Sequence, residues 1–384
     1  MVANTLTNLL PDAYKALDVV SREQIGMIPA VMVDADVSRL AVGETLYSGE
    51  APASTASDIT AGTEVPNTGD QTIGAVSATI NKARSVQFRW NGEQTRHVNA
   101  GQGVLSLQQN QIAQAMRTLV NEMESDLTAL HTGFSRAYGT AGTTPFGTAG
   151  DFTDATETLR ILKDNGAPTS DNHLIVGSAA GAKLLGKQSR ADIAGDVQMQ
   201  RQGIFYEQSG LSVRESGQIG TFTKGTGASA TTDNAGYAIG ATVLTLASAG
   251  TGTLLAGDVV TFAGDTNKYV IASGDADVSG GGTITLTAPG LRVAMSAATK
   301  AITVVATSTR NMAFTRSAII LGTRLPSLPE AGDKAVDRTT IIDPRSGISF
   351  ELALYPGFRV MNYWIGAAWG ANLMKPAHTA LLLG

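Results

Sequence analysis

The sequence predicts an α+β chain with an all-β domain inserted into its second half. Three observations predict this class: alternating apolar and polar residues between positions 75 and 92, a long stretch of helical periodicity from about 102 to 135, and a change of texture between about 223 and 307. In that last interval charges are few, Gly and Thr are abundant, and short β segments follow one another between turns.

Composition limits the possible classes of function. The 384 residues leave room for about two or three domains. The chain has no cysteine, which excludes disulfides and thiolate sites and fits a reducing cytoplasm. The net charge of −5, with no basic cluster, argues against a sequence-specific nucleic-acid binder. There is no signal-peptide pattern, and the most apolar stretch, "YWIGAAWGANLM", is too short to cross a bilayer. We therefore expect a soluble protein.

The first hundred residues are predicted to form an arm and an extended loop. Residues 1–43 read as an arm with short helical pieces, one of them opened by Pro11. Residues 44–71 are polar and rich in small residues, as in a long exposed loop. The segment "AVSATINKARSVQFRWNG" then alternates twice, with Val86, Phe88 and Trp90 on one face of its second half. We expect both halves to belong to a β arm around the loop.

A long helix is the strongest single prediction. From about Gln102 to Ser135 apolar residues recur mostly at steps of three and four, and "GTAGTTPFG" ends the pattern. At 1.5 Å per residue this is a rod on the order of 50 Å long. A single apolar stripe of that length predicts a scaffold element that lies across a sheet or another subunit.

Mixed α/β texture follows, and then the insert. "DFTDATETLRILKDNGAP" predicts a helix that stops at Gly166 and Pro168, and "NHLIVGSAAGAKLLGKQ" a buried strand followed by a helix. Within 223–307 the segments "TVLTL", "DVVTF", "KYVIA", "TITLT" and "AITVV" predict a small antiparallel barrel or sandwich. Residues 308–384 return to mixed texture with several strands.

The string "GAKLLGKQ", Gly181 to Gln188, is the most tempting chemical motif. It fits G-x-x-x-x-G-K between a strand and a helix, as a phosphate-binding loop would. However, Gln188 stands where Ser or Thr should hold magnesium, and Leu184 and Leu185 suit the buried face of a continuous helix. We therefore interpret the string as helix.

Other candidate residues favour structural roles. The four histidines, His97, His131, His173 and His378, show no metal-ligand spacing, and His131 suits a solvated or interfacial position. Glu122, Glu124 and Asp126 are interpreted as the wet face of the long helix, and Trp364 and Trp369 as core residues. The sequence predicts no enzyme, and no catalytic, cofactor-binding or metal-binding residue.

The order of these parts resembles the major capsid (coat) proteins of tailed double-stranded-DNA bacteriophages. "MVANTLTNLLPDAYKALDVVSRE" is similar to the opening of the subfamily that carries an inserted β-barrel domain, and "DPRSGISFE" with "AAWGANLMKPAHTALLLG" to its ending. "AGDVVTFAG" is similar to a strand–turn segment of that inserted domain. The resemblance covers nearly the whole chain.

The resemblance implies a division of the chain. An N-terminal arm would span 1–43, an extended β loop 44–98, the spine helix of the peripheral domain 99–149, and the first part of the axial domain 150–222. The inserted β-barrel domain would span 223–307, and the second part of the axial and peripheral domains 308–384. Some relatives cross-link through a lysine of the extended loop. Residues 44–81 contain none and Lys82 is the nearest, so a non-covalent shell is expected.

The resemblance also implies partners and a location. Copies of the chain would form hexamers and pentamers around a separate scaffolding protein, with a portal protein and with packaged double-stranded DNA bound without sequence specificity. The protein would reside in the virion and assemble in the host bacterial cytoplasm, without a membrane. Two alternatives from other classes are a carbohydrate-binding, adhesin-like surface protein, from the β-rich insert, and the nucleotide-hydrolysing enzyme suggested by "GAKLLGKQ".

Overall fold

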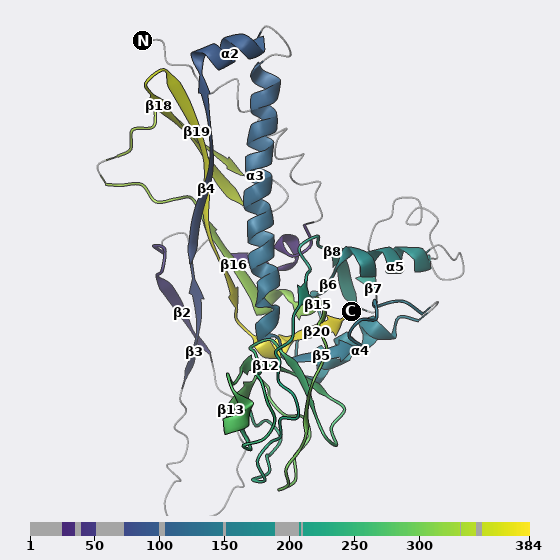
Figure 1. Cartoon of the computed structure of the whole chain (residues 1–384). Coiled ribbons are helices and arrows are strands. Elements are labelled where there is room, and N and C mark those ends of the chain that lie inside the picture. The colour runs from purple at the N-terminus through teal and green to yellow at the C-terminus, as the bar shows by residue number, and fades with distance from the viewer. Residues whose placement is uncertain are drawn as a thin grey trace, which may run out of the picture.

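The chain folds into an elongated body with a long helix along one side and a β-rich lobe at one end (Figure 1). The computed structural model describes residues 25–34, 40–50, 73–99, 104–148, 151–188, 207–208, 210–330, 332–342 and 348–384. The helix expected after Pro11 lies outside these residues. The long helix is α3, Val104–Ala129, and a 3-10 turn, η4, Leu130–Gly133, continues it.

A six-stranded sheet lies against α3. Its strand order is β1-β16-β19-β18-β17, and β4 pairs with β19. The strands are β1 Met32–Asp34, β4 Lys82–Asn91, β16 Ile319–Arg324, β17 Asp337–Ile342, β18 Ser349–Gly357 and β19 Val360–Leu373. Apolar residues of α3, among them Met116 and Met123, pack with Trp369 and other sheet residues in the largest hydrophobic core. The apolar stripe of the helix and one face of the sheet therefore bury each other, as predicted.

Strand β4 corrects the expected extent of the arm. All ten residues of β4 pair with β19, from Lys82 opposite Trp369 to Asn91 opposite Val360. Phe88 stacks on Tyr363 with ring centroids 4.9 Å apart, and Trp90 is buried in the main core. The alternating apolar face of β4 is thus buried against the sheet and α3. This segment is therefore not part of a free arm.

The arm itself is a two-stranded hairpin of β2, Thr45–Glu50, and β3, Gly74–Thr79. It packs on the body only near its base, where Thr79 meets β19. Gly370 lies so close to this base that a Cβ on it would fall 1.8 Å from the Thr79 carbonyl oxygen. The short helix α2, Gly92–Asn99, sits at the opposite end of β4 (Figure 1).

A second, 12-stranded sheet forms the rest of the body and extends into the insert. Its order is β10-β13-β12-β5-β20-β15-β6-β8-β7. The body strands are β5 Arg136–Gly139, β6 Asn172–Val176, β7 Glu207–Gln208, β8 Leu211–Glu215, β9 Thr221–Phe222, β15 Ser308–Thr315 and β20 Thr379–Leu383. Strand β20 lies between β5, to which it is parallel, and β15, to which it is antiparallel. The predicted helices are α4, Thr153–Asp164, and α5, Ser178–Gln188.

The insert has its own hydrophobic core, and each of the five predicted β segments contains a strand. The strands are β10 Val243–Leu246, β11 Val259–Phe262, β12 Lys268–Ser273, β13 Gly282–Leu286 and β14 Ile302–Val304. They pair in the order β10-β13-β12-β11-β14. Thr231 bridges to Ala301 beside β14, and Thr232 bridges to Leu246 of β10, so this segment links the two outer strands.

One contact of the insert was not expected from the sequence. Strand β12 also pairs with β5 of the body, with Lys268 opposite Ala137 and Tyr269 opposite Arg136. The insert is therefore continuous with the body's sheet. The remaining short elements are 3-10 turns: η2 Ile28–Ala30, η5 Val278–Gly280, η6 Arg316–Ala318 and η7 Pro376–His378.

Candidate functional site

The phosphate-loop candidate is part of a helix. Helix α5 begins at Ser178, three residues before Gly181, and the Gly181 N–H donates to the Gly177 carbonyl at 2.9 Å, as in a helical turn. Leu184 is buried among apolar residues of α4, β6 and β8. The helical interpretation of "GAKLLGKQ" is confirmed, because a phosphate loop needs these amides free of helical hydrogen bonds.

The four histidines occupy separate places. His173 is buried in β6, and its Nε2 lies 3.1 Å from Asp171 Oδ1. His97 is exposed on α2, His378 lies in η7, and His131 lies in η4. Within the described ranges no three His, Asp or Glu side chains group closely enough to hold a metal ion.

The expected wet face of the long helix is wrong for Glu124. This carboxylate is only 1% exposed, and its Oε1 accepts the backbone N–H groups of Gly26 and Met27, each at 2.7 Å. Its Oε2 accepts the N–H of Ile28 at 3.1 Å. Burial raises the pKa of Glu124, and these hydrogen bonds oppose the rise. The side chain therefore fixes the segment that precedes β1 to the C-terminal part of α3.

The other two carboxylates of this group tie α3 to β4. Lys82 Nζ lies 2.7 Å from Asp126 Oδ1 and 3.3 Å from Glu122 Oε1, and these partners raise the lysine pKa. Trp369 donates from Nε1 to Asp126 Oδ2 at 2.8 Å and is fully buried. The core prediction for Trp369 is confirmed. Lys82 is engaged within its own chain.

The core prediction for Trp364 is wrong. Trp364 is 39% exposed on the six-stranded sheet, and its Nε1 donates to Gln87 Oε1 at 2.8 Å. It packs edge-on against Tyr355, with ring centroids 5.9 Å apart. Alternation along β19 explains the error, because Ile365 points into the core and Trp364 points away from it.

An open groove adjoins Trp364 on the sheet. Pro326, Leu328 and Pro329, from the loop after β16, form one part of its lining. Arg338 and Glu351 also line it, and Arg338 Nε lies 2.6 Å from Glu351 Oε1. The groove thus combines apolar walls with an internally paired charge.

The arm exposes apolar side chains along a surface with little cover. Tyr47 on β2 is 69% exposed and Ile73, just before β3, is 71% exposed.

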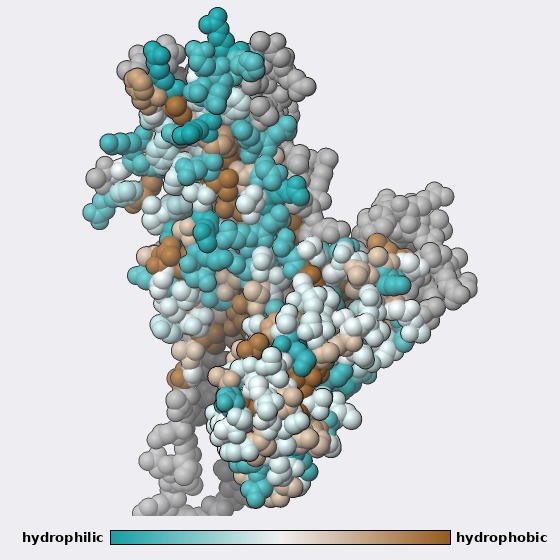
Figure 2. Space-filling view, in the orientation of Figure 1, coloured by the Kyte–Doolittle hydropathy of each residue, from teal (hydrophilic) through white to brown (hydrophobic). Residues whose placement is uncertain are grey.

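Exposed apolar side chains also occur outside the arm. Leu328 in the groove and Phe358 at the turn between β18 and β19 are both exposed. Figure 2 shows hydrophobic residues in brown interrupting the polar surface along the length of the molecule. Surfaces of this kind typically bind another protein.

A further polar cluster, which the sequence did not reveal, lies where the insert joins the body. It consists of His131, Phe222, Asp258 and Arg310, which come from four separate segments of the chain. In the sequence Arg310 stands in "TSTRNMAF", after three hydroxyl residues and beside Asn311, so no local signal predicts its burial. The partners of a buried arginine are identified only by the fold.

Solved structures of phage particles are similar to this chain. A structure from Mycobacterium phage Che8 is 12% identical, with 92% of this chain and 90% of that chain covered and a TM-score of 0.46. The capsid structure of the cyanophage P-SCSP1u is 11% identical, with 92% and 86% covered and a TM-score of 0.48. The mature capsid of bacteriophage PhiM1 is 9% identical, with 93% and 86% covered and a TM-score of 0.46.

The sequence matches no protein-family model and no curated protein. Phage capsids are among the structures that this chain is similar to. Among the helices of the described residues, none is long and apolar enough to cross a membrane.

Proposed function

We propose that the chain is a structural subunit of an icosahedral bacteriophage capsid and that its working surfaces are the arm, the sheet groove and the ends of the body. Residues 44–80 act as the extended loop, α3 as the spine helix of a peripheral domain, and the sheet around β6, β15 and β20 as the axial domain. Residues 223–307 act as an inserted β barrel, supported by the bridges of Thr231 and Thr232 that link its outer strands.

The arm is the observation that carries this proposal. An isolated two-stranded hairpin is marginally stable in water at best. Within the described residues, β2 and β3 pair with each other alone and expose Tyr47 and Ile73. Strand β3 is anchored at its base by the Asn372 side chain, which accepts the Thr79 N–H at 3.0 Å. A hairpin held in this way gains its missing burial from a neighbouring molecule. A subunit that closes a shell requires such contacts.

The partners follow from this role. The chain associates with further copies as hexamers and pentamers, assembles around a scaffolding protein with a portal protein at one vertex, and encloses double-stranded DNA. Its net charge of −5 suits a lining that does not bind phosphate tightly. The mature location is the virion, after assembly in the bacterial cytoplasm.

The test is assembly by a variant whose arm has lost its apolar surface. Tyr47→Asp combined with Ile73→Asp should abolish closed particles in the presence of scaffolding protein, as seen by negative-stain microscopy. The circular dichroism of the subunit should stay unchanged, because both side chains are exposed. Tyr47→Phe is the matched control and should assemble normally. A parent chain that stays monomeric with its scaffold, or an aspartate variant that still forms shells, would overturn the proposal.

A further inference from the structure

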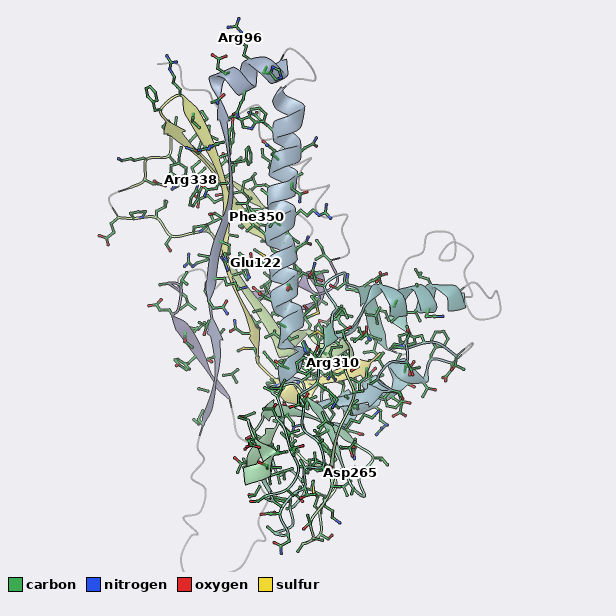
Figure 3. The ribbon with its side chains drawn as sticks, viewed as in Figure 1. Arg96, Glu122, Asp265, Arg310, Arg338 and Phe350 are labelled. Atoms are coloured by element: carbon green, nitrogen blue, oxygen red, sulfur yellow. The ribbon has the colours of Figure 1, made fainter. Side chains whose placement is uncertain are left out.

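The insert is attached to the body by two neighbouring strands. The chain enters the insert after β9 and leaves it at the start of β15, and these strands pair with Phe222 opposite Ser308 and Thr221 opposite Thr309. Both connections therefore form one two-stranded stalk. Figure 3 shows Arg310 close to the lower end of α3, where this stalk meets the body.

Arg310 is a buried cation without a direct partner in the described part of the chain. It is 2% exposed, and none of its three guanidinium nitrogens has a hydrogen-bond partner there. Its guanidinium carbon lies 5.1 Å from the centre of the Phe222 ring, a cation–π contact. Burial lowers the pKa of Arg310 to about 10, and the charge of Asp258 opposes the fall.

Asp258 only partly compensates this charge. Its side chain is fully buried and accepts the backbone N–H groups of Gly225, at 2.9 Å, and Leu255, at 2.8 Å. Both oxygens therefore serve the backbone of the insert. Lys224, which follows β9, donates from Nζ to the Gly225 carbonyl at 3.4 Å.

His131 approaches the same aromatic ring from η4. Its ring lies 5.4 Å from that of Phe222, with an interplanar angle of 74°. Nδ1 lies 2.9 Å from the Thr128 carbonyl oxygen, which can only accept, so Nδ1 carries the proton and neutral His131 has a bare Nε2. That Nε2 is buried with no hydrogen-bond partner among the described residues. Burial lowers the pKa of His131, and the positive charge of Arg310 lowers it further. The hydrogen bond to the Thr128 carbonyl has the opposite effect and raises the pKa.

The insert rests directly on this histidine turn. Gly257, in the turn before β11, lies so close that a Cβ would fall 2.8 Å from Thr132 Cγ2 and 3.1 Å from the Phe222 ring. The turn before β11 therefore packs directly on η4 and on the Phe222 ring that His131 also contacts. The second attachment, the pairing of β12 with β5, involves few residues, and the Lys268 ammonium supports it by donating to the Gly139 carbonyl.

We propose that this junction is a pH-sensitive hinge, in which protonation of His131 places a second cation beside Arg310 and tilts the insert away from η4. The stalk strands β9 and β15 remain paired and act as the pivot. The direction follows from linkage: the closed state disfavours the protonated imidazole, so the junction's stability is complete above the ordinary histidine pKa of about 6.5 and is lost as the pH falls below it. The hinge belongs to the single chain and does not depend on shell formation.

The test uses the absence of cysteine, which lets two spin labels be placed without background. Labels at Lys163→Cys on α4 and Val243→Cys on β10, both exposed positions, report the distance between body and insert by pulsed electron paramagnetic resonance. The unassembled chain should give one narrow distribution at pH 7.5. At pH 5.5 we expect a second, displaced population. The rise in the open-to-closed ratio is limited to about tenfold, because this pH lies only about one unit below the ordinary histidine pKa of about 6.5 that the open state would have.

Two variants and one control decide the role of His131. His131→Gln, which can still donate to Thr128, and His131→Phe, which keeps the aromatic contact, should each abolish the displaced population. His173→Gln should retain it, because His173 has a pKa also lowered by burial but lies in β6, away from the insert. Any of three results would overturn the hinge. The parent could lack the displaced population, both His131 variants could retain that population, or His173→Gln could lose it.

Discussion

Replacing Glu124 with alanine should loosen the segment before β1 and lower the free energy of unfolding. The variant leaves three backbone N–H groups, those of Gly26, Met27 and Ile28, without their acceptor. Each unsatisfied buried group costs about 1–3 kcal/mol, and loss of a poorly solvated carboxylate offsets part of the sum. We expect a net loss of about 2–4 kcal/mol. Glu124→Gln should cost less, because its one carbonyl oxygen can still accept from Gly26 and Met27.

Urea unfolding of the unassembled subunit measures the loss, and hydrogen exchange of residues 25–34 locates it. The pKa of Glu124 is raised in the fold, so the pH-dependent part of its contribution to stability is fully present below the ordinary glutamate pKa of about 4.5 and is lost as the pH rises through the folded-state pKa. The stability advantage of the parent over Glu124→Gln should therefore grow as the pH falls toward about 4.5. An alanine variant within about 0.5 kcal/mol of the parent, with exchange unchanged at residues 25–34, would refute the reasoning.

Two further substitutions test the packing that positions the arm and the spine helix. Gly370→Ala places a methyl group against the backbone of Thr79, so it should lower the free energy of unfolding by about 1–3 kcal/mol and increase proteolysis of the arm. Gly92→Ala is the control: the space around Gly92 is open, so neither quantity should change. Trp369→Phe removes the hydrogen bond to Asp126 and leaves a void, so a loss of about 2 kcal/mol is expected in denaturant unfolding; an unchanged midpoint would contradict the buried role of the indole.

Periodicity predicted the elements of this chain better than their partners. The long helix, the strands of the insert and the helical state of "GAKLLGKQ" followed from local patterns, and the structure confirms them. Strand β4 was assigned to the arm, because alternation reports that one face is buried but not which sheet buries it. Trp364 was assigned to the core although it sits one residue out of phase with the buried face of β19.

The polar residues of interest were less accessible to sequence analysis for the same reason. Glu124 has the composition of a solvated helical face, and only the return of residues 26–28, nearly a hundred positions away, buries it. Arg310 and His131 meet across the Phe222 ring, although no spacing in the sequence connects them. Contacts of this range depend on topology, which local patterns do not encode.

The central place of β20 has a consequence for the order of events during synthesis. Strand β5 emerges early, yet its parallel neighbour in the sheet lies about 240 residues further along the chain, and β15 pairs with that same neighbour. Neither sheet neighbour of β20 can therefore complete its hydrogen bonding until Thr379–Leu383 has been synthesised. The sheet of the body therefore closes only after the whole insert and both strands that flank it have been made.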